Sequence, residues 1–126
     1  MTIMNIKHFL IITSSLVDLD LLWTGFLARN LYVERIGALM RAEPVWLPIV
    51  VFYLLYSAAI LYFAVAPGGS LAATAFRGAF LGLTAYGTYD LVNYALLAHW
   101  PLSVTLIDMA WGVLLTATVA CIGVLI

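Results

Sequence analysis

The chain contains very little charge. Only five of its 126 residues are Lys or Arg and six are Asp or Glu, whereas 66% are hydrophobic. A soluble globular domain needs a larger share of polar residues to cover its surface, so this composition indicates an integral membrane protein. The formal net charge of -1 argues against nucleic acid as a partner, because binding phosphates requires a basic patch.

Cysteine and histidine are also scarce. Cys121 is the only cysteine, so the chain cannot form an internal disulfide. His8 and His99 fall near opposite faces of the membrane and cannot join one zinc centre, and no serine has a histidine at its own membrane depth to act as a base. We therefore expect no metal and no cofactor, and we favour a role other than catalysis.

Four apolar segments are long enough to cross a bilayer, which requires about 20 helical residues. Only helices and closed barrels satisfy the backbone in lipid, and segments of this length indicate helices. The sequence therefore predicts an all-α integral membrane bundle of four transmembrane helices, forming a single domain over residues 1–126. The predicted spans are residues 9–28, 44–66, 71–98 and 102–126.

The connections between these segments differ in character. Residues 67–70, Pro-Gly-Gly-Ser, predict a tight turn, and residues 99–101 predict another. Residues 29–43 are longer and mix apolar with charged residues. This pattern fits a short helix lying at the membrane interface or a polar loop.

Four aspartates interrupt the apolar segments: Asp18, Asp20, Asp90 and Asp108. A charge near the middle of a bilayer costs at least about 2.5 kcal/mol unless it is paired, hydrated or protonated, so such residues often mark a functional site. Counted along the predicted helices, Asp20, Asp90, Asp108 and Tyr53 all lie about 9–14 Å below the same membrane face. These residues should form one polar layer.

Helical spacing also places these acids beside aromatic residues. Asp20 and Asp108 are each followed three positions later by a tryptophan, and Asp90 belongs to a polar stripe on the third segment. Asp18 should point away from Asp20. The predicted ligand-binding or proton-binding residues are Asp20, Asp90, Asp108, Tyr53, Tyr56, Tyr86, Tyr89, Asn93, Trp23 and Trp111.

The polar layer allows three interpretations. Carboxylates beside indole rings can bind an organic cation, and closely spaced carboxyl groups titrate as a coupled set. We therefore predict binding or proton-linked transport of a small cationic or amphipathic molecule. Alternatively, the layer only fixes helix packing in a structural or accessory subunit of a membrane complex, or the chain is a lipid-modifying membrane enzyme. Expected partners are membrane lipids and the unknown small molecule.

Small residues line the third segment, where Gly78 and Gly82 are flanked by Ala75 and Ala85. Missing side chains let helices approach closely, either inside the bundle or between subunits. Four helices filled by Trp and Tyr side chains leave little interior for a transport pathway. We therefore expect a homodimer through the Gly78 and Gly82 face.

Several motifs resemble the domain of unknown function 2177 family of bacterial membrane proteins. The resemblance covers nearly all of the chain and implies four spans and a location in the bacterial inner, or cytoplasmic, membrane. It implies no particular reaction, substrate or cofactor. The motifs are Asp20-Leu-Leu-Trp23-Thr-Gly25, Phe52-Tyr53-Leu-Leu-Tyr56, Gly78-Ala-Phe-Leu-Gly82, Tyr86-Gly-Thr-Tyr89-Asp90-Leu-Val-Asn93 and Asp108-Met-Ala-Trp111-Gly112.

Overall fold

The computed structural model describes residues 3–126, and this part of the chain contains helices and turns but no strand. The predicted all-α fold class is therefore confirmed. The five α-helices are α1 (Ile3–Leu22), α2 (Arg29–Ile36), α3 (Trp46–Ala59), α4 (Leu71–Leu96) and α5 (Leu102–Leu125).

Two of the long helices continue into π-helical segments. α1 is followed by η1 (Trp23–Leu27), and α3 is followed by η3 (Ile60–Val65). With these extensions, three segments are long and apolar enough to cross a membrane: Asn5–Leu27, Trp46–Val65 and Leu102–Leu125. α4 is longer than any of them but is not in this group, because Arg77, Asp90 and Asn93, together with several Thr, Tyr and Gly residues, lower its hydropathy.

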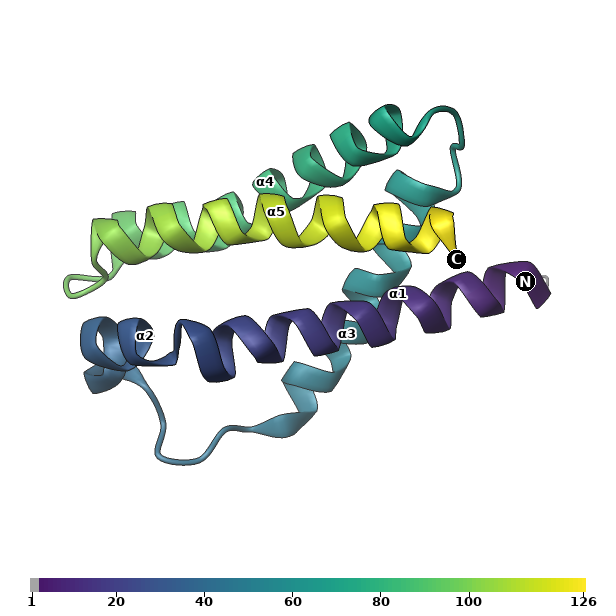
Figure 1. The fold of residues 1–126 in the computed structure, drawn as a ribbon. Coiled ribbons are helices and arrows are strands. Elements are labelled where there is room, and N and C mark those ends of the chain that lie inside the picture. The colour runs from purple at the N-terminus through teal and green to yellow at the C-terminus, as the bar shows by residue number, and fades with distance from the viewer. Residues whose placement is uncertain (1–2) are drawn as a thin grey trace.

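The helices form an elongated bundle (Figure 1). α4 and α5 run antiparallel and side by side, α1 lies beneath α5, and α3 crosses behind α1. The two ends of the chain lie at one end of the molecule, whereas α2 and the turn between α4 and α5 lie at the other. The core that joins these helices includes Ile12, Leu16, Ile60, Leu115 and Val119, each at most 1% exposed.

Glycines on α4 and α5 allow these two helices to pack closely. Gly78, Gly82 and Gly112 are buried. A Cβ added to Gly82 would clash with the Gly112 carbonyl, and one added to Gly78 would lie 2.9 Å from the Cα of Ala117. The Gly78 and Gly82 face is thus covered by α5 of the same chain. The missing side chains of Gly78 and Gly82 therefore serve helix packing within the chain, and the homodimer stays a prediction.

The connections agree with the sequence in part. Gly68 and Gly69 have positive φ angles of 75° and 90°, as the predicted turn requires, and the Ser70 hydroxyl caps α4 by accepting a hydrogen bond from Ala73 N at 3.1 Å. The first connection contains the short helix α2. Pro44, however, lies in the loop, because Val45 is extended and α3 begins at Trp46.

Candidate functional site

Asp20 is the point where three helices meet. Its carboxylate accepts hydrogen bonds from the Tyr53 hydroxyl of α3 at 2.7 Å and from the Trp111 indole N–H of α5 at 3.1 Å. Thr24, one turn further along the chain, donates to the backbone carbonyl of Asp20 at 2.7 Å and lies 3.3 Å from its carboxylate. The residue therefore links α1 to α3 and α5 through neutral donors.

Asp108 is held from the opposite side by α2. The Tyr32 hydroxyl donates to the Asp108 carboxylate at 2.9 Å and accepts a hydrogen bond from the Trp23 indole N–H at 3.2 Å. Tyr32 is only 7% exposed and packs with Ala28, Trp100 and the start of α5. The short helix after α1 thus covers one end of the polar layer.

Two indole rings connect the Asp20 and Asp108 environments. Trp23 and Trp111 stack with ring centroids 4.8 Å apart and an interplanar angle of 14°. Each ring directs its N–H away from the shared face, Trp111 to Asp20 and Trp23 to Tyr32. The result is one continuous polar and aromatic cluster drawn from α1, η1, α2, α3 and α5.

Asp90 completes this cluster from α4. Its side chain is fully buried, and neither carboxyl oxygen receives a hydrogen bond from an N–H or O–H donor among the described residues. Its polar neighbour is the Asp108 carboxyl group. A buried carboxyl group without a donor is costly, so this pair is the least satisfied polar feature of the layer.

The remaining tyrosines are placed differently. Tyr56 is 6% exposed and shares a 2.7 Å hydrogen bond with the Thr116 hydroxyl, while its ring meets the Tyr86 ring edge-on at 6.2 Å. Tyr86 lies over Gly112, whose missing side chain makes room for the ring. Tyr56 and Tyr86 therefore pack together between the helices, beside the acidic cluster.

Tyr89 and Asn93 lie at the edge of the layer. Tyr89 is 55% exposed, and its ring packs edge-on against Trp100 at 5.7 Å. Asn93 interacts with the Tyr89 hydroxyl rather than with the three aspartates at the centre. The structure thus gathers eight of the ten predicted site residues at the centre and places Tyr89 and Asn93 at the edge.

Sequence reasoning missed two polar contributors, Tyr32 and Thr116. Thr24 shares the helix face of Asp20 and Trp23, as the sequence predicts. Thr116 could have been found in the same way, since it follows Gly112 by one helical turn. Tyr32 had no such signal, because it lies on a separate helix whose docking position depends on the turn after η1.

Asp18 lies apart from this cluster. It is exposed on the outer surface of α1, two positions from Asp20, as helical geometry predicts. The two aspartates share a residue type and a helix but not an environment. Asp18 is therefore a matched control for substitutions at the site.

Tyr32 should remain protonated at alkaline pH. Burial raises the pKa of its hydroxyl well above its usual range, and the carboxylates of Asp108 and Asp90 add to this effect. A folded pKa above the unfolded value favours folding below about pH 10, and this contribution is lost as the pH rises through the folded pKa. Tyrosinate absorbance between pH 9 and pH 11 should therefore be the same for wild type and for Tyr32→Phe.

A loss of one tyrosine equivalent of absorbance change in Tyr32→Phe over this range would show that Tyr32 ionises there. That result would contradict the buried placement of Tyr32 over Asp108.

Long apolar helices surrounding a buried polar cluster define a helical integral membrane protein. The chain belongs to the domain of unknown function 2177 family, described as a predicted membrane protein family, whose model matches residues 5–125. No curated protein and no solved structure matches the chain.

Proposed function

We propose that the protein binds a small cationic or amphipathic molecule at the Asp20, Asp90 and Asp108 cluster and transports it in exchange for protons. The observation that carries this proposal is the grouping of three carboxyl groups, from α1, α4 and α5, around a stacked pair of indole rings. Carboxylates supply negative charge and indole faces attract organic cations.

The donors around the cluster support a cationic ligand. Every hydrogen bond that the structure gives to Asp20 and Asp108 comes from a neutral Tyr, Trp or Thr side chain. Neutral donors stabilise a carboxylate but leave its charge uncompensated. A cation or a proton would supply the missing positive charge at low cost in a water-poor site.

Asp90 and Asp108 are the proposed site of proton exchange. Two ionised carboxylates in contact repel each other, so the pair is most stable when its members share one proton. Tyr32 faces the pair from α2, Tyr89 lies beside it on α4, and Asp20 lies across the indole stack. A cation that binds here would displace the shared proton, so cation binding and proton release are coupled.

This function places α4 in the membrane as a fourth span. α4 packs antiparallel against α5 and diverges from it toward the start of α4 (Figure 1). α5 is apolar enough to cross a bilayer. Part of what makes α4 less apolar is hidden from lipid, since Asp90 is fully buried and Gly78 and Gly82 pack against α5. We propose a multi-pass location in a bacterial inner membrane, as the family resemblance implies.

A structural role is the second candidate, and Asp20 favours it. Its carboxylate already accepts hydrogen bonds from Tyr53 and Trp111, which satisfies about half of its capacity without any ligand. If the whole layer works in this way, the protein is a structural or accessory subunit. Asp90 is the residue that distinguishes the two functions, since it lacks such donors.

The proposal is tested with tetraphenylphosphonium, a hydrophobic organic cation, by calorimetric titration of the purified protein at pH 6 and pH 8. Affinity should rise with pH by up to about tenfold per unit, because one proton is released for each cation bound. Asp90→Asn and Asp108→Asn should each weaken binding at least about tenfold and remove the pH dependence, whereas Asp18→Asn should behave as wild type.

Two results would count against transport. Binding and pH response that survive unchanged in both Asp90→Asn and Asp108→Asn would exclude the proposed site. If wild type did not bind the cation, and the two variants lost stability or a co-purifying partner, the structural role would be favoured.

A further inference from the structure

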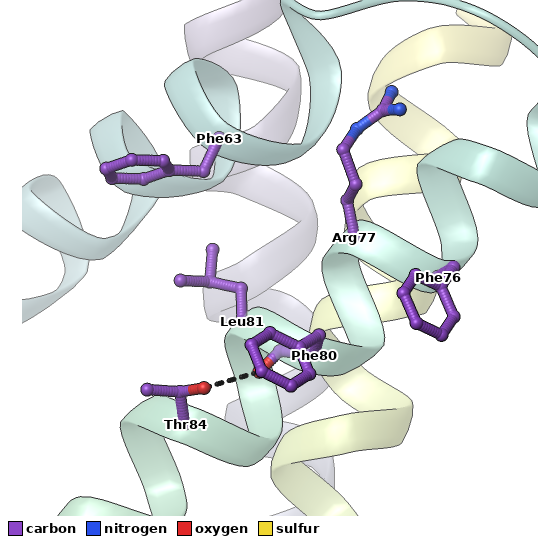
Figure 2. A pocket seen from close by; sticks show the side chains of 6 residues that line it. All are labelled: Phe63, Phe76, Arg77, Phe80, Leu81 and Thr84. Atoms are coloured by element: carbon purple, nitrogen blue, oxygen red, sulfur yellow. Dashed lines mark hydrogen bonds between the residues drawn. The ribbon is translucent and has the colours of Figure 1, made fainter.

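A groove on the outer face of α4 contains none of the residues of the acidic cluster. Figure 2 shows the six residues that line it, and its volume is about 360 Å³. One wall comes from η3 and the rest from the first half of α4. The lining residues are Phe63, Phe76, Arg77, Phe80, Leu81 and Thr84.

The body of the groove is apolar and open to the surroundings. Phe76, Phe80 and Thr84 follow one another at four-residue intervals, so they share one face of α4. Phe76 is 72% exposed, Phe80 is 62% exposed and Phe63 is 58% exposed. The Thr84 hydroxyl donates to the Phe80 carbonyl at 2.9 Å, which leaves its methyl group to line the groove (Figure 2).

Arg77 places a positive charge at one end of this groove. Its Nε and Nη2 atoms donate to the Ala64 carbonyl at 3.1 and 3.0 Å, and Nη2 also donates to the Gly68 carbonyl at 2.5 Å. These bonds draw the guanidinium toward the turn that connects η3 to α4, as Figure 2 shows. Carbonyl oxygens carry no formal charge, so the guanidinium keeps its positive charge, and Nη1 makes none of these bonds.

Along the groove, the positive charge therefore lies near the membrane surface and the apolar surface lies deeper. A phospholipid has its phosphate group and its acyl chains in the same order. The turn at residues 66–70 marks one end of both membrane helices, and Arg77 reaches back to it as arginines near an interface do. Thr84 lies seven residues further along α4, about 10 Å deeper at the rise of an α-helix. The aromatic rings cover the distance between these two levels.

We propose that this groove binds an anionic phospholipid of the surrounding bilayer, with the phosphate group at Arg77 and an acyl chain over Phe80 and Phe63. The inference uses the placement of α4 in the membrane proposed above, but it does not depend on the acidic cluster. A basic side chain beside an apolar groove between membrane helices is the chemistry that retains anionic lipids.

The test is native mass spectrometry of the purified protein with phosphatidylglycerol or phosphatidylcholine of identical acyl chains. One arginine near a membrane surface contributes enough to favour the anionic lipid about fivefold. Arg77→Gln should reduce this preference to near parity. Arg35→Gln, which changes an arginine bonded to Ser103 at the other end of the molecule, should leave the preference intact.

A second variant guards against misfolding of Arg77→Gln, since Arg77 also bonds the end of η3. Phe80→Ala removes an exposed ring and should lower retention of both lipids several-fold while keeping the preference for phosphatidylglycerol. Equal retention of both lipids by wild type would overturn the proposal, as would full retention by Phe80→Ala. Asp90→Asn should not change lipid retention, so the proposed lipid site and the proposed cation site are tested independently.

Discussion

Replacing Gly82 with alanine is expected to destabilise the protein by about 3 kcal/mol and to reduce the yield of folded material. The added methyl group would clash with the Gly112 carbonyl and lie 2.8 Å from the Thr116 hydroxyl. The backbone cannot yield without separating α4 from α5, and these two helices form the closest packing in the fold. Unfolding in mixed detergent, followed by gel filtration, measures the loss.

Gly25→Ala is the matched control for this substitution. Apart from the adjacent residues and the backbone of its own helix, nothing lies within 4 Å of a Cβ built at Gly25, so the methyl group meets open space. Alanine is also the better helix former by about 1 kcal/mol, and the variant should be as stable as wild type or more so. If Gly82→Ala matched Gly25→Ala in stability, the close contact between α4 and α5 would be contradicted.

Replacing Asp20 with alanine should cost about 2–4 kcal/mol of stability. The change removes the acceptor for Tyr53 and Trp111 and leaves both donors without a partner in a half-buried position. Each hydrogen bond between membrane helices contributes about 0.6 kcal/mol on average, and the unsatisfied donors add to that loss. The unfolding free energy in detergent measures the effect.

Asp18→Ala changes the same residue type two positions away and should cause no loss of stability, since Asp18 is exposed. Equal destabilisation by both substitutions would mean that Asp20 contributes only its charge and not its hydrogen bonds with Tyr53 and Trp111. A stable Asp20→Ala variant would remove the argument that this residue joins α1 to α3 and α5.

These expectations separate folding from function within one cluster. Asp20 is well supplied with donors, so its substitution should act mainly on stability. Asp90 has no N–H or O–H donor among the described residues, so its substitution should act mainly on cation and proton binding. Asp90→Asn should not destabilise the protein, because an amide N–H can donate to the Asp108 carboxylate.

Much of the fold could be predicted because it depends on local and periodic properties. The turn at Gly68 and Gly69, the start of α5 at Leu102 and the all-α class follow from turn chemistry and from the length of apolar segments. The exact starts of α1 and α3 could not be predicted. α1 begins at Ile3, before its apolar segment, and α3 begins at Trp46, after Pro44.

The sequence was sufficient to predict the membrane depth of the candidate site residues and the helix face on which each one lies. Asp20, Asp108 and Tyr53 share one layer because helical rise fixes depth, and the tryptophans follow the acids because helical spacing fixes the face. Tyr32 was not predictable, because nothing in its own segment specifies that α2 folds back over Asp108.

Composition and helical spacing were sufficient to predict a helical membrane protein whose acids and aromatic residues lie together at one depth. Which residues meet depends on how the helices pack: Trp111 meets Asp20, Tyr32 meets Asp108, and Asp90 meets a second carboxyl group instead of a donor. The same packing places Gly78 and Gly82 against α5 rather than on an outer face. The physical reason is that periodicity fixes which side chains share a face, whereas the rotation and tilt of each helix depend on packing against its neighbours.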